Sequence, residues 1–164
     1  MCRTKSGIAV LANDELKVYH LPGEDSHEKI RQHYNIQDGL GAGATRQTPV
    51  ECIPVRGVEK LADFDFTFDD GQPAWWAEAF TRQAKRELWR AFRAEWDGKT
   101  LKRGGNLYLR SLTSLPEGVT LEAGGDLDLS SLTSLPEGVT LKAKSVWNGK
   151  TWLSVAEYRK AMKK

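Results

Sequence analysis

The sequence is poor in the residues that build metal centres and disulfides. Its 164 residues include only 2 cysteines and 3 histidines, and Cys2 and Cys52 form no CxxC pair. His27 and His33 are six residues apart in the predicted first helix, a spacing that puts their side chains on different faces. The glycine-rich stretch at 39–43 lacks the spacing of a phosphate-binding loop. We therefore expect no metal and no cofactor.

Catalytic groups in a recognisable arrangement are also missing. Asp25, Ser26 and His27 are consecutive, and consecutive side chains at a helix start diverge, whereas a hydrolytic triad must converge. Ser26 is better explained as the N-cap of that helix, and Cys52 as a packing residue of a strand. The sequence predicts a protein that is not an enzyme. A small hydrolase using Cys52 or a histidine is the alternative.

Long hydrophobic runs and a strong charge of one sign are absent as well. No apolar run approaches roughly 18 residues, and the amino terminus lacks the apolar core of a secretory signal. We therefore expect a soluble, intracellular protein. The formal net charge is only +2, but residues 1–72 carry 8 basic against 12 acidic side chains, and residues 73–164 carry 16 against 10. Such asymmetry suggests a charged partner or simply two separately patterned segments.

The first 97 residues have the pattern of a small antiparallel sheet with helices. Residues 13–15 predict a turn between two strands. A helix is predicted from Ser26 to Asn35, with Ile30 and Tyr34 facing the core. Strands rich in branched and aromatic residues are predicted at 7–12, 16–21, 49–53 and 63–69, the last with phenylalanine and acidic residues alternating.

A long amphipathic helix is predicted at 73–96, with Pro73 at its first position and Ala77 on its apolar face. Its opposite face could be an ordinary solvated surface, partly neutralised by Glu78 four residues before Arg82. Alternatively it contacts phosphates or an acidic protein surface. We call this face the arginine stripe; it consists of Arg82, Lys85, Arg86, Arg90 and Arg93.

Two other groups of residues are candidate contact surfaces. Adjacent Trp75 and Trp76 cannot both face one core, so one of them should be partly exposed, either at a binding hot spot or beneath a loop. An acidic strand face is either the polar outer side of the sheet or a carboxylate row that enters a basic nucleic-acid channel of another protein. This acidic face consists of Asp63, Asp65, Asp69 and Asp70.

An internal repeat is the strongest pattern in the chain. Residues 107–126 align without gaps to 127–146, and the block SLTSLPEGVTL occurs in both. A partial unit with Leu101 and two glycines precedes them, one period earlier. A period of 20 residues with LxL segments and Pro-Glu-Gly corners predicts stacked coils that bury their leucines against one another.

Two short segments resemble those of a known class of proteins. They are LDLS at 127–130 and LTSLP at 132–136, each with a counterpart one period earlier. In them the chain resembles leucine-rich-repeat proteins of bacteria and their phages. The closer of these resemblances is to small phage and prophage proteins in which a short αβ head precedes a few such coils. It departs from the usual pattern in lacking the asparagine between the LxL strand and the next leucine.

The carboxyl-terminal residues are predicted to close the coils. Asn148-Gly149 indicates a hairpin with a type I′ turn, and Ser154 with Glu157 indicates a capping box that starts a last helix. The predicted fold is therefore α+β: a small antiparallel sheet with two helices, then a short leucine-rich-repeat-like β-solenoid capped by a hairpin and helix. The expected domains are an αβ head at 1–97, two and a half coils at 98–146 and a cap at 147–164.

Together these patterns predict a non-enzymatic protein-binding module. The resemblance implies a more specific hypothesis: a phage accessory protein in the bacterial cytoplasm that inhibits a host defence complex, such as a CRISPR effector. Its partner is then a bacterial protein or ribonucleoprotein complex, and no membrane is involved. Direct nucleic-acid binding through the arginine stripe is the alternative. Exposed strand edges and tryptophans leave a homodimer open.

Overall fold

A computed structural model describes residues 5–37, 46–96 and 98–162. Cys2 and the glycine-rich stretch at 39–43 lie outside these residues. The described chain is a mixed α+β structure with three α-helices and several sheets, as the sequence predicts. None of the described helices is long and apolar enough to cross a membrane.

The head contains one antiparallel sheet whose strands run in the order β2-β1-β3-β4. The β1–β2 connection is a two-residue turn, because Ala12 pairs with Glu15. Asn13 and Asp14 between them have φ angles of 50° and 60°, as a type I′ turn requires. The four strands are β1 (Lys5–Ala12), β2 (Glu15–Tyr19), β3 (Arg46–Pro54) and β4 (Phe64–Phe68).

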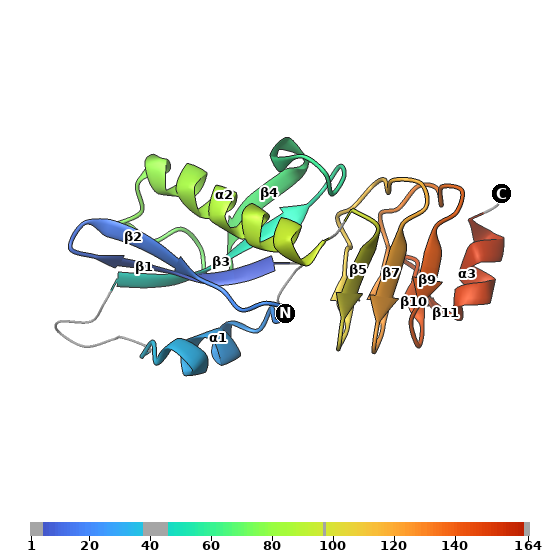
Figure 1. The fold of residues 1–164 in the computed structure, drawn as a ribbon, viewed down its shortest axis with the longest axis horizontal. Helices are drawn as coiled ribbons and strands as arrows, with labels where there is room; N and C mark the ends of the chain where they lie inside the picture. Colours follow the sequence, from blue (N-terminus) through green and yellow to red (C-terminus); the bar gives the residue numbers. More distant parts are fainter. Residues whose placement is uncertain (1–4, 38–45, 97, 163–164) are drawn as a thin grey trace.

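Helices α1 (His27–Tyr34) and α2 (Glu78–Glu95) lie on opposite faces of this sheet (Figure 1). Ser26 is the N-cap of α1, as predicted, and its hydroxyl accepts the Lys29 N–H. Ile30 is buried, but the prediction that Tyr34 faces the core is wrong, since its side chain is 40% exposed. Tyr34 lies in the last turn, where its ring is tilted by 53° against that of Tyr19, with ring centroids 4.9 Å apart.

Helix α2 begins five residues later than the sequence predicts. Residues 73–77 form a turn in which the Trp76 N–H donates to the Pro73 carbonyl, and Ala77 is an exposed N-cap. The turn places the Trp76 ring in the core, 4.9 Å from the ring of Phe68, while its indole N–H donates to Thr81. Burial of this large ring competes with, and outweighs, the helix preference of the preceding residues.

The repeat folds into two sheets of parallel strands, with β5, β7 and β9 standing side by side beyond α2 (Figure 1). The predicted 20-residue period is present in this first sheet, where Leu101 pairs with Leu121 and Leu121 with Leu141. All three are buried. The repeat pattern does not predict this sheet, because strands are expected only at the LxL segments. Its strands are β5 (Thr100–Arg103), β7 (Thr120–Ala123) and β9 (Thr140–Lys142).

The second sheet has the order β11-β10-β8-β6 and contains the LxL segments. Its first three strands in sequence are parallel, and β11 joins antiparallel to β10. The predicted hairpin is confirmed, but the type I′ turn is wrong: the loop has four residues, and the Asn148 side chain accepts the Lys150 and Thr151 N–H groups. The strands are β6 (Leu107–Tyr108), β8 (Leu127–Asp128), β10 (Val146–Trp147) and β11 (Trp152–Leu153).

Helix α3 (Val155–Ala161) follows β11 at the far end of the coils. The predicted capping box is confirmed: the Ser154 hydroxyl accepts the Glu157 N–H, and the Glu157 carboxylate accepts the Ser154 N–H at 2.8 Å. Tyr158 lies on the buried side of this helix. The last coil is therefore covered by apolar side chains of its own tail.

A buried ionic network joins the head to the coils. Lys5 of β1 lies 2.6 Å from Glu95 at the end of α2, and Glu95 lies 2.7 Å from Arg103 of β5. Arg103 also pairs with Asp25, which precedes α1, at 3.1 Å. Burial raises the pKa of Asp25, although Arg103 and Lys5 oppose this shift. Four side chains from four different segments of the chain therefore fix the orientation of the first coil.

Candidate binding face

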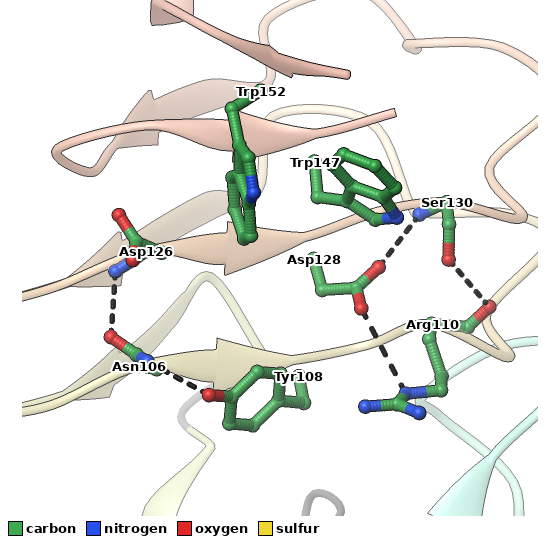
Figure 2. A pocket seen from close by; sticks show the side chains of 8 residues that line it. All are labelled: Asn106, Tyr108, Arg110, Asp126, Asp128, Ser130, Trp147 and Trp152. Carbon is green, nitrogen blue, oxygen red and sulfur yellow. Dashed lines mark hydrogen bonds and ion pairs between the residues drawn. The ribbon is translucent and has the colours of Figure 1, made fainter. Parts of the chain in front are cut away.

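The second coil sheet carries a row of aromatic and acidic side chains on its outer side. Strand register places Tyr108 beside Asp128, Asp128 beside Trp147 and Trp147 beside Trp152. Together with residues from the neighbouring rows they surround a depression of about 390 Å³ (Figure 2). We call this the coil face; its lining residues are Asn106, Tyr108, Arg110, Asp126, Asp128, Ser130, Trp147 and Trp152.

The two tryptophans are the most accessible part of the coil face. The Trp152 side chain is 50% exposed, more than any other large hydrophobic side chain in the described structure. Its ring centroid lies 5.2 Å from that of Trp147, with an angle of 49° between the planes. The rings therefore form two inclined walls rather than a flat stack.

Polar contacts hold the remaining residues in fixed positions. The Asn106 amide donates to the Tyr108 hydroxyl at 2.8 Å and accepts the Asp126 N–H at 2.9 Å. Asp128 accepts the Ser130 N–H at 3.1 Å. Its other carboxylate oxygen lies 3.8 Å from Arg110 Nε. Because these side chains come from equivalent positions of successive coils, the 20-residue period itself assembles the face.

A change of period turns Trp147 outward, and for this reason the repeat pattern does not predict the coil face. Carried one residue further, the ungapped repeat alignment puts Trp147 at the position of inward-facing Leu127. In the structure Val146 pairs with Leu127 and is buried, while Trp147 pairs with Asp128. The turn before β10 is thus one residue shorter than the turn before β8, and a one-residue shift moves a strand side chain to the other face.

The arginine stripe lies on the exposed side of α2. Arg82, Arg86 and Arg90 line a shallow groove of about 390 Å³. Lys85 and Arg93 are half-buried and do not line it. The expected neutralisation by Glu78 is wrong, since among the described residues Arg82 has no ion pair with it. The three groove arginines therefore present their charge to solvent.

The acidic strand face is less regular than the alternating sequence predicts, because β4 begins at Phe64 and ends at Phe68. Asp63 ends a 3-10 turn and accepts the Lys60 N–H. Asp69 lies after the strand with its carboxylate 3.4 Å from His27 Nδ1. Asp65 and Asp70 remain exposed. Asp63 and Asp69 thus form separate local contacts, and the four aspartates do not continue as one row along the strand.

Of the two adjacent tryptophans, Trp76 is buried and Trp75 is half-exposed, which agrees with the expectation that one of them cannot enter the core. Trp76 packs among Phe66, Phe68 and Phe80. Its role is therefore packing. Trp75 lies against Trp76 with ring centroids 5.6 Å apart and remains a candidate contact residue.

Two side chains that a hydrolase could use, Cys52 and His20, lie in environments that shift their pKa values. Burial raises the pKa of the Cys52 thiol to about 12, so this group is a neutral thiol at physiological pH. Burial and nearby Lys5 lower the pKa of His20. Among the described residues, no cluster of three or more His, Cys, Asp or Glu side chains has the geometry of a metal site. Ser26 and His27 point to different partners, the Lys29 N–H and Asp69.

Comparisons with family models, with curated proteins and with solved structures each found no match to this chain.

Proposed function

We propose that the chain is a non-enzymatic binding protein whose coil face contacts a protein partner. The observation that carries this proposal is the half-exposed Trp152 beside Trp147, Tyr108 and Arg110 in one depression. Tryptophan, tyrosine and arginine are the residues most enriched among those that dominate binding energy. When a partner covers an exposed indole, apolar surface is removed from water, and this lowers the free energy of the complex.

The rest of the architecture suits this role. We propose that residues 98–146 form a short β-solenoid, which the parallel pairing of Leu101 with Leu121 and of Leu121 with Leu141 supports. A rigid stack keeps aromatic side chains in place before a partner arrives, and this reduces the entropy lost on binding. The ionic network of Lys5, Glu95 and Arg103 ties the stack to the head.

The resemblance to phage proteins suggests the kind of partner. We propose a phage accessory protein that acts in the bacterial cytoplasm, where it binds and inhibits a host defence complex such as a CRISPR effector. The partner is then a protein or ribonucleoprotein surface. The exposed groove arginines Arg86 and Arg90 would make a second contact with its acidic or phosphate groups.

The experiment uses bacteria that carry a defined CRISPR system and a phage that this system targets. Expression of the chain should restore plaque formation, and the tagged chain should capture the effector complex. Trp152→Ala should weaken capture by about tenfold or more, as expected for a hot spot. Tyr34→Ala is the matched control, because Tyr34 is 40% exposed but lies on α1 of the head. Equal capture by wild type and Trp152→Ala would remove the coil face from the proposal.

Direct nucleic-acid binding is the second candidate function, since the groove arginines lack ion-pair partners among the described residues. Affinity for DNA or RNA should then fall steeply as salt rises, because bound phosphates release counterions. The double variant Arg86→Glu/Arg90→Glu should reduce both affinity and the salt slope. Lys17→Glu/Lys60→Glu is the control, because it changes the same charge at exposed positions outside α2. Absence of binding at low salt would exclude this function.

A further inference from the structure

We propose that the coil face receives a cationic side chain, arginine or lysine, from the protein partner; this inference rests on the proposed function. The inclined rings of Trp147 and Trp152, 5.2 Å apart, expose indole surface to the depression. The face of an indole is electron-rich and attracts a cation placed over it. Two such walls at an angle of 49° suit a guanidinium or ammonium group better than a broad flat ligand.

The charges of the lining residues favour a cation over an anion. Asp126 and Asp128 are acidic and Arg110 is the single basic residue among the eight that line the depression. Asp128 is only 8% exposed, so solvent screens its charge weakly. Its field reaches the buried Tyr158, whose pKa is raised to about 12 by burial first and by the Asp128 carboxylate second. A phosphate or an acidic peptide would be repelled from this position.

The coil face already contains one example of the proposed contact. The Arg110 guanidinium carbon lies 5.8 Å from the centre of the Tyr108 ring, and Arg110 Nε lies 3.8 Å from Asp128. In Figure 2 the Asp128 carboxylate lies between Arg110 and Trp147. Asp128 therefore has the Arg110 guanidinium and the Tyr108 ring on one side. The indole rings of Trp147 and Trp152 lie on the other side. A partner's cation over these indoles would reproduce the internal arrangement.

The test uses a matched pair of probes, N-acetyl-arginine amide and its uncharged isostere N-acetyl-citrulline amide. Binding is followed through the indole N–H signals of the ¹⁵N-labelled full chain, assigned with single Trp→Phe variants. The arginine probe should shift the Trp147 and Trp152 signals in a saturable manner. The affinity of the citrulline probe should be lower by a factor of roughly five or more. The half-exposed Trp75 in the head is the internal control and should not respond.

Two variants identify the groups responsible. Trp152→Ala should abolish the response of Trp147. Asp128→Asn keeps an oxygen that can accept the Ser130 N–H but removes the charge, and it should weaken the arginine probe by roughly fivefold while leaving the citrulline probe unchanged. Circular dichroism and the melting temperature show whether each variant is folded. For a variant that does not fold, Asp126→Asn provides the same test, because its other contact is a hydroxyl donor from Ser145.

Several results would overturn the inference. Equal binding of the two probes would show that charge plays no part, and an equal shift of Trp75 would show that binding is not specific to the coil face. A concentration-dependent increase in solution mass that Trp152→Ala abolishes would identify a second copy of this chain, in place of another protein, as the occupant of the coil face. Loss of partner capture in Trp152→Ala without discrimination between the probes would leave the proposed function standing and reject only the cation. Probe discrimination with normal partner capture by Trp152→Ala would reject the proposed function instead.

Discussion

The head and the coils are stabilised in different ways. In the head, each core residue has its own environment: Phe64 and Phe92 pack edge to face, and Trp76 fills the space beneath β4. In the coils, the environment of Leu121 is that of Leu101 and Leu141, displaced by one period. The surface of the coils is therefore built in rows. A contact residue in the coils is therefore defined by its register, whereas one in the head is defined by its individual packing.

The largest expected effect concerns backbone contact between successive coils. A Cβ atom on Gly124 would lie 2.1 Å from the Gly104 carbonyl oxygen, whereas a Cβ on Gly104 would have no atom within 4 Å. Gly124→Ala should therefore destabilise the protein by about 3 kcal/mol or more, because the backbones must separate. Thermal denaturation should show a fall in melting temperature of about 10 °C.

Gly104→Ala is the matched control for this experiment. It makes the same chemical change at the equivalent position of the preceding unit, so it should leave the melting temperature nearly unchanged. If both variants melted alike, close stacking of the coils would not be what distinguishes this region from the head.

The next largest effect is the loss of stability when a charge is removed from the buried network between head and coils. It is compared with the same change in an exposed network inside the coils. Lys5 is fully buried, and Glu95 is its acidic partner at 2.6 Å. Glu95→Gln removes that charge but leaves the buried ammonium group, which should cost about 2–3 kcal/mol. In the coils, exposed Lys102 and Lys142 share Glu122 across β5, β7 and β9, and water already screens these charges.

Urea denaturation of Glu95→Gln and Glu122→Gln measures this difference directly. The midpoint should fall clearly for the first variant and hardly at all for the second. Equal shifts would mean that the buried ionic network holds the head to the coils no more firmly than a surface ion pair does.

Much of this fold could be predicted from periodicity, because periodicity reports which side of an element is buried. The strands of the head, the N-cap Ser26 and the period of the coils follow from local pattern. The late start of α2 could not be predicted, since it depends on a tertiary contact that places Trp76 beneath β4.

The coil face was missed for a related reason. Nothing local to Trp147 indicates that the turn before it is one residue short, and only the pairing of Val146 with Leu127 reveals this. The arginine stripe was predicted from helical spacing, which correctly placed Arg82, Arg86 and Arg90 on one face. Its neutralisation by Glu78 was not correct, because exposed side chains gain too little from pairing for sequence spacing alone to determine it.

The smallest effect concerns the cap that closes the coils. Hydrogen bonds from the Ser154 hydroxyl and the Ser154 N–H lower the pKa of Glu157. A lowered pKa in the folded state means that the cap stabilises the protein above the ordinary glutamate range, and that this contribution disappears as pH falls through the lowered value. The difference in melting temperature between wild type and Glu157→Gln should therefore be constant near neutral pH and shrink below about pH 4.

Melting curves recorded at intervals between neutral and acidic pH measure this dependence. The control is Glu137→Gln, an exposed position in the corner of a coil, where no such difference is expected. Because the cap acts only on the first turn of α3, the effect should be small, and it should concern the end of the coils alone. A difference that grew with acidity, or that matched the control, would show that Glu157 does not hold the end of the coils through its charge.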